Sequence, residues 1–254
     1  MPRTTWLVHH DSLIAHIRRS GTCRARPSRA TCAFVPDTTA VLLDVYRTVL
    51  HVEFGRVERT LAEAAGVSLE PFHEALGAVA PQVTIGRLTM AQALDRALRS
   101  CGTALSSAAI TDLVRRDGDS LLAESRVYDD VVPVLSALKS LGIRVAFVSN
   151  CVVNTRPILV ALGLAELVDA TILSCEVGAA KPSGAIFEHA LTALGVERSA
   201  VLLIDDQPEY CDGAMAFGAR AIQIARDASA EVHATSHAVI HSLDELLPML
   251  TEAT

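Results

Sequence analysis

The sequence predicts an α/β protein in which a doubly wound parallel sheet carries an inserted helical cap. First, an apolar run that begins at Val41 ends in a single acid, Asp44, as expected of a buried strand. Second, residues 53–128 show the three- and four-residue apolar spacing of amphipathic helices. Third, strand and helix patterns alternate from residue 129 onward, which indicates parallel strands joined by helical crossovers.

The composition of the 254-residue chain argues against a membrane protein and against a nucleic-acid-binding protein. Half of the residues are apolar, yet no apolar run approaches the roughly 18–20 residues that a membrane span needs. The net charge of −7 disfavours nucleic acid as the main partner. The cysteines lack C-x-x-C spacing and no signal-peptide pattern precedes them, so we expect reduced thiols in a cytoplasmic protein. They are Cys23, Cys32, Cys101, Cys151, Cys175 and Cys211.

Residues 1–38 differ from the rest of the chain. Six arginines face only two acids, Asp11 and Asp37, in this stretch. Its apolar segment Leu13–Ala15 is too short for the hydrophobic region of a signal peptide. We therefore expect a poorly ordered N-terminal extension that precedes the folded protein.

Residues 53–128 are expected to form a compact helical module inserted after the first strand. Turn signals at Gly66, Pro81 and Gly102 divide the segment, and Thr89 is suited to cap the third helix. Strand-like alternation is not found in this segment. The four expected helices cover residues 57–65, 70–79, 90–99 and 107–116.

Residues 39–52 and 129–254 are expected to form the sheet and the helices that cover it. Several helix patterns stop at glycines such as Gly142 and Gly195, which are frequent just after helix C-termini. Beyond the first strand, strands are expected over residues 144–149, 170–173, 200–204, 219–224 and 237–241. Helices are expected over 131–141, 155–162, 184–194 and 209–217, with a last helix capped by Ser242.

Polar residues stand at the ends of several expected strands and in one loop between them. Parallel neighbours place their carboxyl ends at the same edge of a sheet, so these residues are expected to converge. A single acid or hydroxyl after a strand is common in loops, but four such features in this order favour a functional site. The four features are Asp44 with Thr48, Ser149 with Asn150, Lys181 before Pro182, and Asp205 with Asp206.

Each residue type in this set has its own chemical use. Asp44 is the expected nucleophile, because carboxylates form covalent intermediates with phosphorus or activated carbon. Thr48 can donate a hydrogen bond to an anionic substrate or fix the turn. Ser149 and the amides around Asn150 can bind phosphate-like oxygens. Lys181 can neutralise charge on the nucleophile and on the transferred group.

Hard oxygen ligands for Mg²⁺ are also present. Asp44, Asp205 and the main-chain carbonyl of Tyr46 would form such a site, and bound Mg²⁺ would reduce the repulsion between a carboxylate and a phosphate. Asp206 is expected to ligate the metal through water or to orient Lys181. The predicted metal ligands are therefore Asp44, the Tyr46 carbonyl, Asp205 and Asp206.

These motifs resemble those of the haloacid dehalogenase superfamily, whose four motifs are matched in order by Asp44–Thr48, Val148–Asn150, Lys181 and Ile204–Asp206. The resemblance implies a Rossmann-like core, an aspartate-based hydrolase and a small-molecule substrate. The helical insert is similar to the C1 cap of the superfamily, which closes over the site and selects the substrate. Arg47 replaces the glycine that usually follows in the first motif.

Tyr46 departs from the pattern of the superfamily's phosphatases. Those enzymes usually carry an aspartate there, which protonates the leaving alcohol and then activates water. Tyrosine, with a pKa near 10, is a poor substitute near neutral pH. The related 2-haloacid dehalogenases do carry tyrosine and need no acid or metal, but their fourth motif resembles Ser-Ser-Asn instead of an acidic pair. The predicted catalytic residues are Asp44, Tyr46, Thr48 and Lys181.

Three interpretations of the function follow. The first is a Mg²⁺-dependent phosphatase of a small phosphorylated metabolite, and the second is a 2-haloacid dehalogenase-type hydrolase. The third is a catalytically weakened protein that binds a ligand or partner. We expect no nucleic-acid or membrane partner, and a homodimer is a candidate assembly. Arginines of the helical insert are candidate partners for a substrate carboxylate, namely Arg56, Arg59, Arg87, Arg96 and Arg99.

Overall fold

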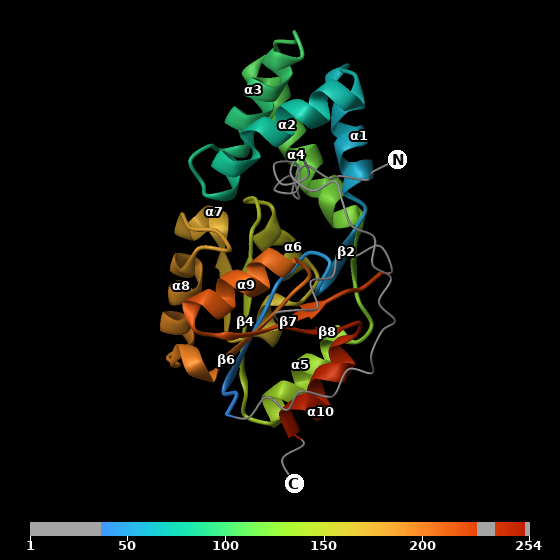
Figure 1. Ribbon diagram of the computed structural model, residues 1–254. Helices are drawn as coiled ribbons and strands as arrows, with labels where there is room; N and C mark the ends of the chain where they lie inside the picture. Colours follow the sequence, from blue (N-terminus) through green and yellow to red (C-terminus); the bar gives the residue numbers. More distant parts are fainter. Residues whose placement is uncertain (1–36, 228–236, 252–254) are drawn as a thin grey trace, which may run out of the picture.

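The core of the protein is a six-stranded parallel sheet. The computed structural model describes residues 37–227 and 237–251, so the predicted extension 1–38 lies outside the described residues except for its last two. The strands are β1 (Ala40–Leu43), β4 (Arg144–Ser149), β5 (Ala170–Leu173), β6 (Val201–Asp205), β7 (Arg220–Ile224) and β8 (Ala238–Ile240). Their order is β5-β4-β1-β6-β7-β8 and every neighbouring pair is parallel, which confirms the predicted α/β fold (Figure 1).

Helices cover both faces of the sheet, and the central strand β1 accordingly carries apolar side chains on both sides. Val41 and Leu43 belong to one buried cluster and Ala40 and Leu42 to another, since successive side chains of a strand point to opposite faces. The first cluster includes side chains of α5 (Val131–Ser140), α6 (Thr155–Ala161) and α10 (Leu246–Thr251), and the second those of α8 (Gly184–Leu194) and α9 (Pro208–Phe217). Short helical segments are η2 (Ala165–Leu167), α7 (Ser174–Val177), η3 (Arg198–Ala200) and η4 (Leu243–Glu245).

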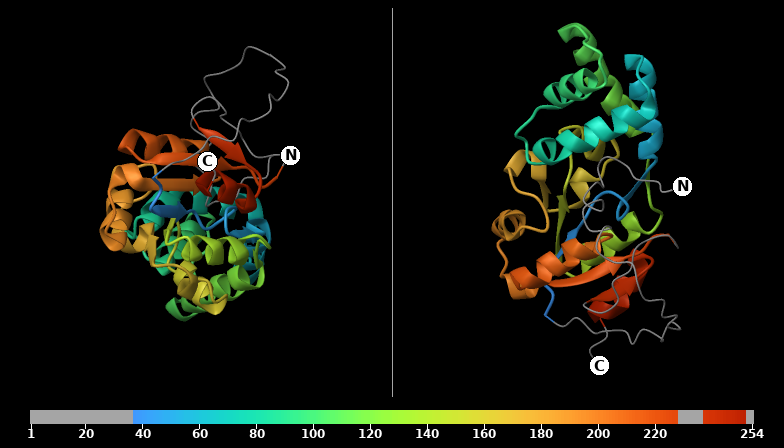
Figure 2. Two further views of the ribbon diagram at one scale, coloured as in Figure 1. Left: turned by 90° about the horizontal axis from the view of Figure 1, so that it is seen from below. Right: turned by 45° about the horizontal axis from the view of Figure 1, so that its top comes forward.

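Four helices form a separate layer at one end of the molecule (Figures 1 and 2). They are α1 (Phe54–Ala65), α2 (Leu69–Thr84), α3 (Met90–Ser100) and α4 (Ser107–Ala123). The layer buries its own apolar cluster, which includes Phe72 and Leu94. Thr89 caps α3 as expected: its hydroxyl accepts from the Gln92 amide at 3.2 Å, and the Gln92 side chain accepts from the Thr89 amide at 2.9 Å. Through α2 and α4 the layer contacts α7 and α6, which follow the carboxyl ends of β5 and β4.

The chain enters and leaves this layer through a two-stranded ribbon. β2 (Leu50–Val52) precedes α1, β3 (Ser125–Val127) follows α4, and the two strands pair antiparallel with Val52 opposite Ser125. The prediction that residues 53–128 contain no strand is therefore wrong at 125–127. Three residues are too few to show strand alternation, and the pairing partner lies far away in the sequence.

The turn expected at Pro81 is absent, because α2 continues through this residue to Thr84. Proline removes the hydrogen bond to the carbonyl four residues earlier, here that of Gly77, and its ring crowds that turn of the helix. Gly77 has no side chain to add to the crowding. Ala80 and Val83 lie on either side of Pro81 and are buried in the cluster of the helical layer, so packing outweighs the loss of one hydrogen bond.

None of the helices in the described ranges has the length and apolar character that a membrane span requires. The longest of them, α4, has 17 residues, whereas a span needs about 20 predominantly apolar ones.

The helix α4 also extends beyond its predicted end at residue 116. The sequence pattern indicates an earlier end because a buried acid interrupts the apolar periodicity. Asp117 has 1% of its surface exposed. Its carboxylate accepts a hydrogen bond from Asn154 Nδ2 at 2.6 Å, which joins the helical layer to the loop that follows β4. Burial raises the pKa of Asp117 to about 6, although the bond from Asn154 opposes this effect.

We expect Asp117→Asn to stabilise the protein at neutral pH. The native carboxyl binds its proton more tightly than the unfolded chain does, so its contribution to the free energy of unfolding falls as pH rises from about 4 to 6 and stays low above that. An asparagine can still accept from Asn154 but carries no charge. The variant should gain about 2 kcal/mol at pH 8 and little at pH 4, as measured by urea unfolding.

Asp119→Asn is the matched control, because Asp119 lies on the same helix with 67% of its side chain exposed. Its ion pair with Arg115 is solvent-exposed and should contribute little to stability at either pH. Equal pH dependence of unfolding in the wild type and in Asp117→Asn would contradict the assignment.

Candidate active site

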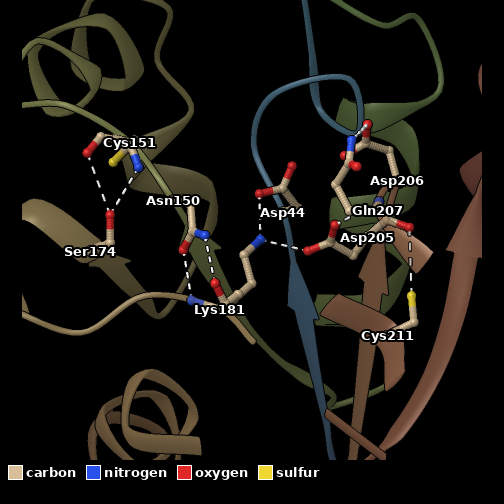
Figure 3. A network of polar contacts seen from close by, with 9 residues as sticks. All are labelled: Asp44, Asn150, Cys151, Ser174, Lys181, Asp205, Asp206, Gln207 and Cys211. Carbon is tan, nitrogen blue, oxygen red and sulfur yellow. Dashed lines mark hydrogen bonds and ion pairs between the residues drawn. The ribbon is translucent and has the colours of Figure 1, made fainter. Parts of the chain in front are cut away.

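One lysine and two carboxylates form the centre of the site (Figure 3). Asp44 directly follows β1 and Asp205 ends β6, and the register of these strands pairs Leu43 with Ile204, which sets the two acids side by side. Lys181 Nζ lies 2.6 Å from Asp44 Oδ1 and 2.5 Å from Asp205 Oδ2. The structure thus brings these three predicted site residues into direct contact.

The charges in this centre are strongly coupled because water is excluded. Lys181 has 0% of its side chain exposed; burial alone would lower its pKa, but the carboxylates of Asp205 and Asp44 hold the pKa above its ordinary value, so the ammonium stays charged. Burial raises the pKa of Asp205 to about 7, with Lys181 opposing and Asp44 adding to the shift. Burial and the like charges of both neighbouring acids also raise the pKa of Asp206. Three carboxyl groups thus share one ammonium, and their full ionisation would leave an excess of negative charge that Lys181 does not neutralise.

A divalent cation fits this excess of negative charge. We name Asp44, Asp205 and Asp206 the carboxylate cluster, since one oxygen of each lies within 4.8 Å of the others. Carboxylate oxygens are the ligands that Mg²⁺ prefers, and a bound cation would also lower the repulsion that raises these pKa values. Gln207 contacts two acids of the cluster: its main-chain amide donates to Asp205 Oδ1 at 3.0 Å, and its side-chain Nε2 donates to Asp206 Oδ2 at 2.8 Å. The Tyr46 carbonyl stays a predicted ligand.

The side chain of Asn150 contacts the Lys181 main chain instead of the open site. Asn150 Nδ2 donates to the Lys181 carbonyl at 2.9 Å, and the Lys181 amide donates to Asn150 Oδ1 at 2.8 Å (Figure 3). This pair of bonds holds the lysine loop against the end of β4. Substrate binding by Asn150 stays a prediction, and it would depend on the main-chain amides around this residue.

Two predicted hydroxyl groups are buried in the same region without a hydrogen-bond partner. They are Thr48 Oγ1 and Ser149 Oγ, and both residues have 0% of their surface exposed. Burial of a polar atom without a hydrogen-bond partner costs free energy. A bound anionic group that accepts hydrogen bonds from these two hydroxyls would remove that cost.

The phenol of Tyr46 is held within the protein. Its hydroxyl lies 2.8 Å from Thr155 Oγ1, and its ring packs edge-on against Phe54 with the ring centroids 5.2 Å apart. Burial raises the pKa of Tyr46 above its ordinary value of 10. This environment makes Tyr46 a weaker acid than a free tyrosine, which reinforces its difference from an aspartate.

The sequence analysis missed two residues that support the site. Tyr210, in the first turn of α9, places its ring 5.1 Å from Lys181 Nζ, and it stands four residues after Asp206 on the same chain segment. Arg226 follows β7, and its Nη2 donates to the Thr48 carbonyl at 2.6 Å while its Nη1 pairs with Asp130 at 2.5 Å. Arg226 stands two residues after the end of β7, so a search for polar residues within two positions of a strand end would have identified it.

The structure brings none of the five predicted arginines of the helical insert to the carboxylate cluster. Arg99 pairs with Asp95 on its own helix, and Arg56 lies 3.9 Å from Glu124. Arg96 Nη1 donates to Gln82 at 3.5 Å. A role for any of these arginines in binding a substrate carboxylate stays a prediction.

Comparison with known proteins shows which family this sequence resembles. A match to the haloacid dehalogenase-like hydrolases covers residues 38–218. Phosphatase MT3486 of Mycobacterium tuberculosis (strain CDC 1551 / Oshkosh) is 28% identical over 220 residues, which cover 85% of this chain and 98% of that protein. Enolase-phosphatase E1 of Sorangium cellulosum (strain So ce56) is 25% identical over 229 residues, 82% of this chain and 97% of that protein.

Among solved structures, a 2-haloacid dehalogenase from Pseudomonas syringae pv. Tomato DC3000 has a TM-score of 0.65 at 22% identity, over 84% of this chain and 97% of that one. At this identity the likeness concerns the fold. The family match, in contrast, spans most of the sequence and contains every residue of the carboxylate cluster together with Lys181. The chain therefore belongs to the haloacid dehalogenase-like hydrolase family.

Proposed function

We propose that this protein is a Mg²⁺-dependent hydrolase of small phosphoric monoesters in the cytoplasm, with Asp44 as the nucleophile. The observation that carries the proposal is the environment of Asp44: Lys181 holds its Oδ1 at 2.6 Å, while Oδ2 has no hydrogen-bond donor among the residues that the structure describes. An oriented carboxylate with one open oxygen is suited to nucleophilic attack. The names of two relatives at 28% and 25% identity, both phosphatases, support the same reaction class.

In the proposed reaction, Asp44 Oδ2 attacks phosphorus and the bond to the leaving oxygen breaks, which gives a phosphorylated aspartate and an alcohol that takes its proton from water. A water molecule then attacks the same phosphorus, so phosphate leaves and the Asp44 carboxylate is restored. Lys181 keeps a positive charge beside Asp44 in both steps. The hydroxyls of Thr48 and Ser149 would donate to phosphoryl oxygens. Mg²⁺ held by the carboxylate cluster would supply a Lewis acid.

Removal of the metal should abolish this activity. We expect EDTA to lower the hydrolysis of p-nitrophenyl phosphate at least about 100-fold, because the negative charge of the cluster would then repel the phosphate. Added Mg²⁺ in excess should restore the rate. Hydrolysis that continues unchanged in EDTA would contradict the proposal.

Replacement of Tyr46 tests the missing acid. Tyr46→Asp should raise the turnover of an alkyl phosphate by about 10²-fold or more, because a carboxyl group can protonate the leaving alkoxide. The gain should be smaller for p-nitrophenyl phosphate, whose leaving group needs no proton. The smaller side chain also leaves a cavity beside Phe54 and should cost about 2–4 kcal/mol in the free energy of unfolding.

Tyr46→Phe is the control for this experiment, since it removes only the hydroxyl that contacts Thr155. It should not raise the turnover of either substrate. A Tyr46→Asp protein that is folded and binds Mg²⁺ but gains no activity would argue against an intact phosphatase site.

A second candidate function is 2-haloacid dehalogenation, and the buried phenol of Tyr46 is the observation that favours it. Halide leaves carbon without a proton, so a site without an acid is sufficient for that reaction. Release of chloride from 2-chloropropionate in the presence of EDTA would support this function. Failure of every phosphate ester and haloacid would favour the third interpretation, a ligand-binding protein without efficient catalysis.

A further inference from the structure

Arg47 has a backbone conformation that its side chain does not favour. Its φ is 62°, and only Asp37 shares a positive φ among the described residues that are not glycine. A left-handed conformation is costly for a residue with a Cβ atom and persists where the surrounding structure enforces it. Here the Arg47 amide donates to the Leu50 carbonyl at 2.6 Å, and Arg226 holds the next carbonyl, that of Thr48. The loop therefore fixes the direction in which the Cα–Cβ bond of Arg47 leaves the main chain.

The guanidinium of Arg47 lies beside the carboxylate cluster without using its hydrogen-bond donors. Its Nη1 is 3.7 Å from Asp206 Oδ2, beyond hydrogen-bond distance, and that oxygen already accepts from Gln207. Arg47 donates no side-chain hydrogen bond to any residue in the described ranges, and 44% of its side chain is exposed. The guanidinium thus keeps its donors for a group that enters from solvent.

Other charged groups in this region are already committed. Lys181 is fully buried and bonded to Asp44 and Asp205. Arg226 is 8% exposed, pairs with Asp130 and stacks over the ring of Tyr128 at 4.1 Å. Burial raises the pKa of Tyr128, and the positive charges of Arg226 and Arg47 oppose that shift.

We propose that Arg47 is a specificity-determining residue that binds a second anionic group, a carboxylate or a phosphate, on the substrate. The proposal rests on the proposed function, in which the scissile phosphate is bound at Asp44 Oδ2. Arg47 lies 3.7 Å from Asp206, and a carboxylate oxygen of Asp206 lies within 4.8 Å of one of Asp44, so the second anion would lie a few bonds away from the reacting phosphorus. The planar fork of a guanidinium matches a carboxylate or a phosphate with two parallel hydrogen bonds. The substrate class is therefore a phosphorylated small acid or a bisphosphate.

Two phosphonates that cannot be hydrolysed test this inference by calorimetry on the full-length protein with Mg²⁺. Phosphonoacetate carries a carboxylate where ethylphosphonate carries a methyl group. We expect Arg47→Gln to weaken the binding of phosphonoacetate about 10- to 100-fold and that of ethylphosphonate less than about threefold. Arg47→Lys should retain part of the preference. Arg126→Gln, at an exposed position of β3, is the control and should change neither affinity.

Three outcomes would overturn the inference. Equal weakening of both probes by Arg47→Gln would mean that Arg47 serves only as a countercharge to Asp206, and no effect on either probe would mean that it has no role in binding. In both cases the wild type still binds phosphonates, so the proposed function is untouched. If the wild type binds neither probe and hydrolyses no phosphate ester, the proposed function fails together with the inference.

Discussion

Asp44→Asn should abolish hydrolysis. The change keeps the shape of the side chain and its contact with Lys181 but removes the nucleophilic oxygen. We expect kcat to fall by at least about 10⁴-fold, as is typical when the group that forms the covalent intermediate is lost. Phosphate release from p-nitrophenyl phosphate measures the rate. The variant should be at least as stable as the wild type, because one of three crowded negative charges is gone.

Asp129→Asn is the control for this variant, since Asp129 is an exposed aspartate outside the carboxylate cluster. It should retain the wild-type kcat. A folded Asp44→Asn protein whose kcat stays within tenfold of the wild type would exclude Asp44 as the nucleophile.

Lys181→Met should have the largest effect on stability. The buried ammonium is the partner of both Asp44 and Asp205, and its removal leaves two carboxylates side by side without compensation. Breaking a buried ion pair in this way costs about 3–5 kcal/mol. Urea unfolding at pH 8 should therefore show a lower midpoint with an unchanged slope. Hydrolysis should be lost as well, since the charge beside the nucleophile is gone.

The only other lysine of the chain provides the matched control. Lys139 is exposed near the end of α5, and Lys139→Met should change stability by less than about 0.5 kcal/mol. The loss in Lys181→Met should shrink at low pH, where the carboxylates bind protons and no longer repel each other. Equal effects of the two substitutions at pH 8 would contradict the electrostatic role of Lys181.

The parts of the fold that the sequence predicted well are those with local signals. β4, β5 and α8 have the bounds that were expected, because each is a continuous apolar or amphipathic segment with a polar residue or glycine at its end. The proximity of Asp44 and Asp205 was also predictable. It follows from the parallel pairing of β1 with β6, which places the residues at the ends of both strands at one edge of the sheet.

The parts that the sequence did not predict depend on distant contacts. The ribbon of β2 and β3 forms because two short segments pair with each other, although all four helices of the layer lie between them in the sequence. Asp117 lies just beyond the expected helix end at residue 116, and its burial against Asn154 depends on a loop that is distant in the sequence. The role of Asn150 as a brace for the Lys181 loop depends on side-chain orientation, which no spacing in the sequence encodes.

The ribbon also affects how the sequence of this protein can change in evolution. Because Val52 and Ser125 are paired neighbours, the two ends of the helical insert lie one strand spacing apart, about 5 Å. A segment that begins and ends at adjacent points can be lengthened, shortened or exchanged without moving the strands on which Asp44 and Asp205 are carried. The length and sequence of the helical layer can therefore change independently of the residues around Lys181, whose opposite charges constrain one another.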